Sequence, residues 1–213
     1  MIGIRQVFAI LLSFGGFTPL LPINIATAED ASVAQLTKPM SLPDMALGSA
    51  KAPVSITEFA SMSCPHCAAF EQNVFPMLRS KYIDTGKVHF VFREFPLDIK
   101  AVAAAMLARC IAKGDPEKFF GAIDTLFKQQ DQLMAQTLVT LQQIGKRSGM
   151  NDGDADTCVK DQALLDKLSA DQKFANEELM VSATPTFFIN GKMFKGAMSF
   201  EEMEEKIKPL LKK

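Results

Sequence analysis

Two strand-like segments separated by a helix that opens on a cysteine pair limit the fold of this chain more than any other feature. Residues 54–60 are rich in β-branched side chains and Phe, and the sequence CPHC at residues 64–67 follows after a short loop. Helical spacing then continues to residue 81, and the apolar run at 88–95 has the length of a buried strand. The order predicts a β-α-β unit whose helix begins at a cysteine.

The remainder of the chain predicts a helical stretch followed by a return to strands. Residues 101–112 are rich in Ala, and apolar side chains recur at helical spacing after them, so most of residues 99–180 is predicted to be helical. Asn190-Gly191 is a strong hairpin signal between two short strands. Ser199 with Glu202 predicts a capping box at the start of a last helix. The fold class is therefore α/β.

Composition excludes several classes of protein. With 48% hydrophobic and 22% charged residues the chain is typical of a globular protein rather than a collagen-like, low-complexity or disordered one. The 23 basic and 24 acidic residues give a net charge of -1. Because there is no broad basic field to hold phosphates, nucleic acid is not an expected partner.

The first 28 residues have the pattern of a secretory signal peptide. They carry one charge, Arg5, then an apolar stretch from Val7 to Leu21 and an Ala26-Thr27-Ala28 cleavage pattern. The alternative is an uncleaved membrane anchor, but the apolar stretch is shorter than the roughly 20 residues that a spanning helix needs. Residues 29–53 are interpreted as a leader. The pattern predicts export to an oxidising compartment, where disulfides persist.

Each residue of the CPHC sequence has a chemical reason to be there. Pro65 suits the first turn of a helix, whose free N–H groups and dipole then point at Cys64 and stabilise its thiolate, and His66 adds a polarised N–H or a positive charge. A stabilised thiolate is a good leaving group, which favours donation of the disulfide. Cys67 is expected to be the buried partner. The alternatives are an inert disulfide and half of a zinc site, although no second pair of ligands has suitable spacing.

These residues carry a resemblance to the DsbA family of periplasmic thiol:disulfide oxidoreductases, which extends over nearly all of the chain after residue 28. The matching segments are Ala52-Pro53-Val54, Glu58-Phe59, Cys64-Pro65-His66-Cys67, Val91-Phe92-Arg93-Glu94-Phe95-Pro96 and Thr184-Pro185-Thr186-Phe187-Phe188-Ile189-Asn190-Gly191. The resemblance implies a thioredoxin fold over residues 54–213 with a helical subdomain inserted at about 99–180. It also implies a monomer that has no cofactor besides its redox-active disulfide, oxidises newly exported cysteine-containing proteins, and is re-oxidised by a DsbB-like membrane quinone oxidoreductase.

The resemblance also implies roles for Thr184 and Pro185. The bond between them is expected to be cis, with the Thr184 backbone offering hydrogen bonds to an extended substrate opposite the cysteine pair. Many oxidases of the family have Val where Thr184 stands, whereas related isomerases often have Thr. A disulfide isomerase or reductase therefore remains an alternative, although no dimerisation module precedes Val54. A secreted metal-binding module that uses the cysteines as ligands is the other alternative.

Glu58 is an unusual residue for its position. The period of two along residues 54–60 places it on the same face as Val54 and Ile56, so an acid is expected among apolar neighbours. A buried carboxyl could exchange protons with Cys67, and an acid occurs at this place in the DsbA family. The alternative is a carboxylate that is exposed at the strand end or paired with a base.

The other two cysteines, Cys110 and Cys158, lie 48 positions apart in the helical part. In an oxidising compartment the expected arrangement is a structural disulfide, which would stabilise the chain by about 4 kcal/mol in the chain-entropy model. The alternative is two inert buried thiols, because the sequence does not place the two Cα atoms within bridging distance.

Overall fold

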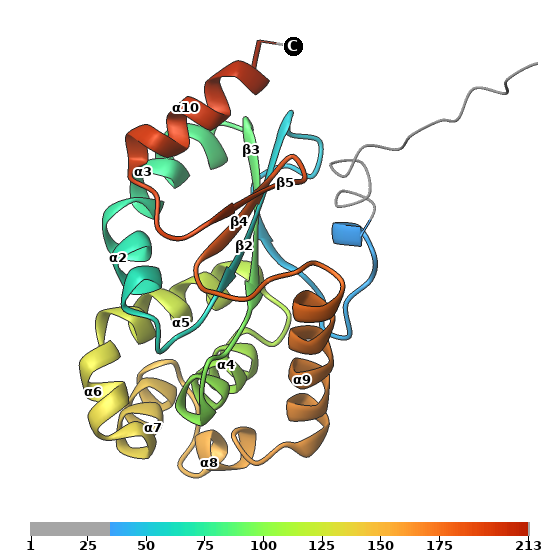
Figure 1. Cartoon of the computed structure of the whole chain (residues 1–213). Coiled ribbons are helices and arrows are strands. Elements are labelled where there is room, and N and C mark those ends of the chain that lie inside the picture. Colours follow the sequence, from blue (N-terminus) through green and yellow to red (C-terminus); the bar gives the residue numbers. More distant parts are fainter. Residues whose placement is uncertain (1–34, 213) are drawn as a thin grey trace, which may run out of the picture.

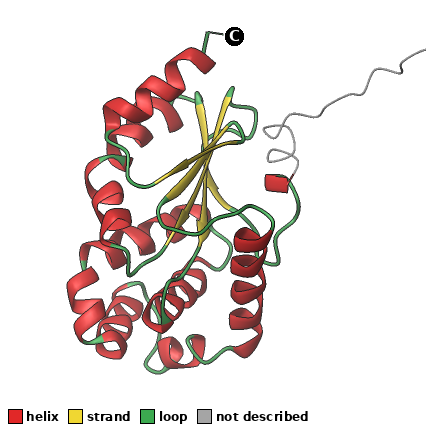
Figure 2. Cartoon of the chain, viewed as in Figure 1, coloured by secondary structure: helices red, strands yellow, loops and turns green. Residues whose placement is uncertain are grey.

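A computed structural model describes residues 35–212, so the predicted signal peptide, residues 1–28, lies outside the described part of the chain. The strands are β1 (Met45–Leu47), β2 (Val54–Ala60), β3 (Val88–Glu94), β4 (Thr186–Ile189) and β5 (Lys192–Lys195). The helices are α2 (Pro65–Asn73), α3 (Phe75–Leu78), the π-helical turn η1 (Arg79–Ile83), α4 (Ile99–Ala112), α5 (Pro116–Lys128), α6 (Gln130–Ala135), α7 (Thr137–Arg147), α8 (Asp154–Cys158), α9 (Gln162–Glu177) and α10 (Phe200–Leu210). The predicted α/β class is confirmed (Figures 1 and 2).

The strands form one sheet in the order β1-β3-β2-β4-β5. Strands β2 and β3 are parallel and are joined through α2, which is the predicted β-α-β unit, whereas the other neighbouring pairs are antiparallel. Phe59 near the end of β2 pairs with Thr186 at the start of β4, and Ala60 pairs with Glu94 at the end of β3. The loop after β2, the loop after β3 and the loop before β4 therefore meet at one edge of the sheet.

The helices cover the sheet and extend beyond that edge. Figure 1 shows α2, α3 and α10 along one side of the sheet, while α4 to α8 gather at the edge where β2 and β3 end and α9 rises on the other side. Helix α5 packs against α2 and reaches the sheet through aromatic rings, of which Phe120 lies 5.6 Å from Phe75 and 6.0 Å from Phe90 between ring centroids. Such ring pairs each contribute about 0.5–1.5 kcal/mol beyond their buried area. The helical segment and the sheet thus share one core.

A buried ion pair joins this helical segment to the sheet and to the leader. Arg109 of α4 donates to Glu94 at the end of β3, with its Nη2 lying 2.6 Å from Oε2. The same guanidinium donates to the backbone oxygen of Pro43 at 2.6 Å. Removing one partner of such a buried pair typically costs about 3–5 kcal/mol.

The hairpin and the helix cap that the sequence predicts near the C-terminus are both present in the structure. Asn190 and Gly191 both have positive φ, 44° and 84°, in the turn between β4 and β5. Asn is one of the few non-glycine residues that tolerates this conformation, so the pair forms the tight hairpin. Ser199 caps α10 and forms the reciprocal capping box with Glu202.

Three elements differ from the sequence analysis. The helix expected over residues 64–81, which the sequence predicts Pro76 to kink, is divided at Val74, because Pro76 has no N–H to donate to the carbonyl of residue 72. Residues 154–180, where the spacing predicts one helix, hold two, α8 and α9. The leader contains the strand β1, whose three residues are too few to show a period in the sequence but pair with β3.

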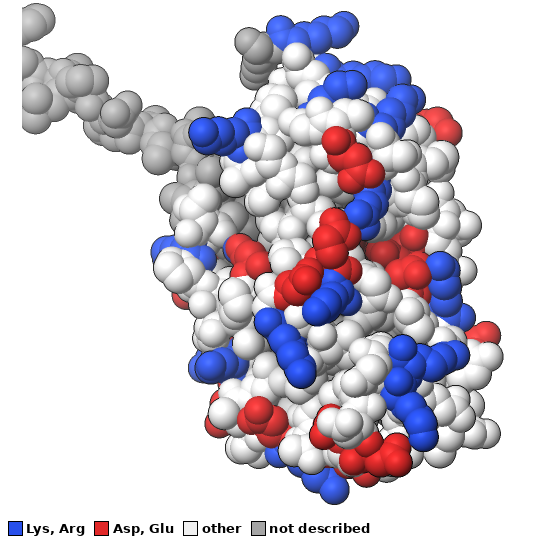
Figure 3. Space-filling view, turned by 180° about the vertical axis from the view of Figure 1, so that it is seen from behind, with Lys and Arg blue, Asp and Glu red and all other residues white. Residues whose placement is uncertain are grey.

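Charged side chains of both signs are interspersed on the face seen in Figure 3, without a broad field of one sign. Within residues 35–212, no helix has both the length and the apolar character to cross a membrane.

Candidate active site

Cys64 lies at the N-terminus of α2, as the sequence predicts, and faces the loop before β4. It is the N-cap residue with extended backbone angles, φ -84° and ψ 117°, and Pro65 occupies the first turn of the helix. Its Sγ lies 3.3 Å from the backbone oxygen of Thr184, to which it donates when protonated, and the Thr184-Pro185 bond is cis. Cys64 keeps 5% of its surface exposed and Cys67, one turn further along α2, keeps none. Both are free thiols.

The surroundings of the two sulfurs hold their pKa values far apart. A hydrogen bond from Cys67 is the largest cause that lowers the pKa of Cys64, and despite burial the pKa falls to about 5. The backbone N–H groups of Cys67 and His66 also lower it, as expected at a helix N-terminus. Burial, the hydrogen bond with Cys64 and the nearby Glu58 raise the pKa of Cys67 above the ordinary thiol range. One sulfur is therefore held as a thiolate and its partner as a thiol.

Thr184 contributes through its side chain as well as its backbone. Its hydroxyl is buried and has no hydrogen-bond partner among the described residues. The polar Thr184 side chain lies near enough to the Cys64 sulfur to help lower the pKa of the thiol. The sequence analysis placed Thr184 here through its backbone, and the structure adds the hydroxyl.

His66 and Pro65 lie at the surface beside Cys64. His66 reaches the sulfur through its backbone N–H, while its ring is exposed. The structure therefore assembles the CPHC residues around the Cys64 sulfur.

Glu58 is buried on β2, with 1% of its surface exposed, and its Oε2 has no hydrogen-bond partner within the described residues. Burial raises the pKa of Glu58 well above its usual value, and the negative charges of Glu71 and Cys64 raise it further. The carboxyl is thus on the buried face that the period of two predicts, and no described base pairs with it. A carboxyl whose raised pKa favours its protonated form therefore lies near Cys67.

Glu71 is a second buried acid that the sequence analysis missed. It lies on α2 one turn after Cys67, and burial followed by the charge of Asp124 raises the pKa of its carboxyl to about 8. Its position four residues after Cys67 on the buried face of a helix was the available signal. Two neighbouring buried acids therefore adjoin the cysteine pair from different elements.

The second cysteine pair lies apart from this site, between α4 and α8. Cys110 and Cys158 form a disulfide with their Cα atoms 6.3 Å apart, within the usual bridging range. Cys158 is buried, whereas Cys110 is partly exposed. The bond ties the end of α4 to the end of α8.

Comparison with known proteins places this geometry in a family. The thioredoxin family model matches residues 41–209. The chain belongs to the thioredoxin family. A putative protein-disulfide oxidoreductase of Rickettsia bellii is 32% identical over 82% of this chain and 67% of the relative. Disulfide bond formation protein D of Bacillus subtilis is 30% identical over 78% of this chain and 76% of the relative.

Solved structures point to the DsbA branch of the family. The crystal structure of Wolbachia pipientis alpha-DsbA1 has a TM-score of 0.77 and 33% identity, and the match covers 85% of this chain and 96% of that one. This chain is accordingly a DsbA-like thiol:disulfide oxidoreductase with the thioredoxin fold. It spans 53 to 67% of the length of its Rickettsia relatives.

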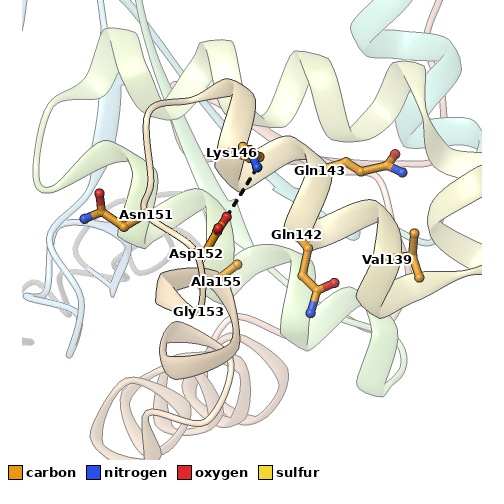
Figure 4. A pocket seen from close by; sticks show the side chains of 8 residues that line it. All are labelled: Val139, Gln142, Gln143, Lys146, Asn151, Asp152, Gly153 and Ala155. Carbon is orange, nitrogen blue, oxygen red and sulfur yellow. Dashed lines mark hydrogen bonds and ion pairs between the residues drawn. The ribbon is translucent and has the colours of Figure 1, made fainter.

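One hollow of this thioredoxin-family protein lies away from the cysteine pair. A hollow of about 430 Å³ lies between α7 and α8, where Lys146 pairs with exposed Asp152 at 3.4 Å (Figure 4). Besides this ion pair it is lined by amides and small or aliphatic residues, and none of the four cysteines is among them. Over residues 35–212, no cluster of three or more His, Cys, Asp or Glu side chains could hold a metal ion.

Proposed function

We propose that this protein oxidises cysteine-containing proteins by donating a disulfide between Cys64 and Cys67. The observation that carries the proposal is the position of the Cys64 sulfur, at the N-terminus of α2 and 3.3 Å from the Thr184 carbonyl oxygen. The helix N-terminus stabilises the thiolate that is released when the disulfide is given away, so the transfer is favourable, and the carbonyl marks the side on which a substrate backbone binds.

The reaction proceeds in two exchanges. A substrate thiolate attacks Cys64 of the oxidised pair, a bond forms between those two sulfurs, and the Cys64–Cys67 bond breaks with its electron pair on Cys67. Cys67 takes up a proton. A second substrate thiolate then attacks the sulfur of the first, and Cys64 leaves as a thiolate. The substrate loses two electrons, and the enzyme pair gains them.

In this scheme Glu58 supplies the proton that Cys67 takes up. Its raised pKa favours the protonated carboxyl, and it lies close enough to Cys67 to act electrostatically on it. Thr184 and Pro185 bind the substrate backbone beside Cys64. The disulfide between Cys110 and Cys158 has a structural role.

The proposal extends to where the protein acts and with which partners. The protein is exported to the periplasm, where it acts as a monomer after cleavage of a signal peptide at residues 1–28. Its substrates are newly exported proteins, and a DsbB-like membrane oxidoreductase restores its disulfide. The redox-active disulfide serves in place of a separate cofactor or metal. The helical subdomain spans about residues 99–180 of the domain 54–213.

The test is the equilibrium of the Cys64–Cys67 pair with glutathione, measured together with the ultraviolet absorbance of the Cys64 thiolate against pH. We expect a strongly oxidising pair and a thiolate that titrates near pH 5. A thiol that titrates near the ordinary value, or a pair as reducing as thioredoxin, would contradict an oxidase. Substantial repair of scrambled disulfides would instead favour an isomerase, the class of related enzyme that often has Thr at the position of Thr184.

A further inference from the structure

The loop that carries Cys64 is held by a side chain from the helical insertion. Gln130, the first residue of α6, directs its side-chain amide at this loop. Its Nε2 donates to the backbone oxygen of Met62 at 2.9 Å and to that of Cys64 at 3.0 Å. One amide group thus uses both of its N–H bonds on two carbonyls that flank a single residue of the loop.

The two carbonyls belong to the turn that orients α2. The Cys64 oxygen also accepts the first hydrogen bond of the helix, from the N–H of Ala68 at 3.1 Å, and the Cys64 N–H donates to the oxygen of Ser61 at 3.0 Å. The direction of this peptide group determines where the N–H groups of the first helical turn point. A group that fixes the Cys64 carbonyl therefore also fixes the amides that face its sulfur.

A second contact from the insertion side supports the same loop. The backbone N–H of Leu97, in the segment that leads into α4, donates to the Ser61 hydroxyl at 3.2 Å. That hydroxyl lies 3.0 Å from the hydroxyl of Ser63. The loop is thus attached at its beginning to the α4 side and at its end to α6.

We propose that Gln130 is a positioning residue for thiol–disulfide exchange, through which the helical insertion holds the Cys64 sulfur against the first amides of α2. The proposal rests on the proposed function, because it concerns the reactivity of the same sulfur. Gln130 lies 66 positions from Cys64 in the sequence and takes no part in the exchange itself.

The variants that test it are Gln130→Met, which keeps the length of the side chain without its donors, and Gln130→Ser, which removes its reach. The matched control is Gln129→Met. Gln129 is the preceding residue and is also half-buried, but its amide oxygen accepts from the exposed Arg147 at 2.7 Å, away from the loop. The full chain is used, and thermal unfolding of each variant is recorded.

We expect both Gln130 variants to raise the pKa of the Cys64 thiol by about half a unit to one unit, the size expected for a lost hydrogen-bond restraint. The glutathione equilibrium should move toward the disulfide form by about threefold to tenfold. Gln129→Met should leave both values unchanged. A merely structural role would lower the unfolding temperature without moving either value.

Three results would overturn the proposal. The first is a Cys64 titration in both Gln130 variants that matches the unmodified protein, and in that case the proposed function stands. The second is an equal shift in Gln129→Met, and the third is failure of both Gln130 variants to fold, which would make the contact structural. If the unmodified protein itself titrates as an ordinary thiol, both this proposal and the proposed function fail.

Discussion

The two cysteine pairs of this protein share one chain and differ in almost every physical respect. Cys64 and Cys67 lie one helical turn apart at the start of α2, and their surroundings drive their pKa values in opposite directions. Cys110 and Cys158 are 48 positions apart and bridge two helices, α4 and α8, near the end of each. The comparison teaches that a reactive pair needs two sulfurs with different pKa values, whereas a structural pair stabilises the fold through the length of the chain segment that its disulfide closes.

The largest expected effect is the loss of activity on changing Cys64→Ser. Serine cannot form the mixed disulfide, so oxidation of a reduced substrate protein should cease, as measured by the formation of its disulfides. The double variant Cys110→Ser with Cys158→Ser should keep the rate of the unmodified protein. Equal losses in both variants would remove the distinction between the two pairs.

Glu58→Gln should slow the oxidation of a substrate dithiol by about tenfold to a hundredfold, because Cys67 loses its proton source. The same change removes a buried acid whose pKa is raised, so the variant should unfold at a higher temperature at neutral pH. The sign follows because an acid whose pKa is raised by folding destabilises the folded protein once the pH exceeds the pKa that the acid has in the unfolded chain. A variant that is both slower and less stable would indicate a structural role for Glu58.

Removing the second disulfide should lower the free energy of unfolding by about 2–4 kcal/mol. Chemical denaturation of the Cys110→Ser, Cys158→Ser double variant measures this change. The glutathione equilibrium of Cys64 and Cys67 serves as the control, and it should remain where it was. A double variant as stable as the unmodified protein would contradict the proposed structural role.

The smallest effect is a pH dependence that only the first pair should show. The pKa of Cys64 is lowered to about 5 in the folded protein. Its thiolate therefore stabilises the folded, reduced protein fully at pH values above the ordinary thiol pKa, and this contribution is lost as the pH falls toward 5. Between pH 5 and 7, the reduced protein should gain about 1–2 kcal/mol relative to Cys64→Ser. Denaturation at several pH values measures it, and parallel curves for the two proteins would contradict it.

The elements that could be predicted from the sequence are those with local signals. The β-α-β unit, the Asn190-Gly191 turn and the cap at Ser199 each depend on residues within a few positions of one another. The burial of Glu58 follows from the period of its own strand. The resemblance to the DsbA family added the loop at Thr184 and Pro185, which no local pattern brings to Cys64.

The features that escaped prediction depend on contacts between distant segments. Gln130 sits among other polar residues, and nothing nearby in the sequence shows that its amide meets the loop 66 positions earlier. Glu94 and Arg109 read as ordinary charges at the end of a strand and on a helix, although they form a buried pair. Strand β1 exists because β3 offers it an edge, which is a property of the sheet rather than of three residues.

The contact between Cys64 and Thr184 spans 120 positions of the chain. During synthesis, the cysteine pair emerges long before the segment that completes its surroundings. A growing chain therefore carries two thiols of ordinary reactivity, and its ability to oxidise other proteins begins when the segment after α9 docks onto the sheet. Because the segment that carries Thr184 comes late in the chain, the cysteine pair becomes reactive only after nearly all of the chain has been synthesised.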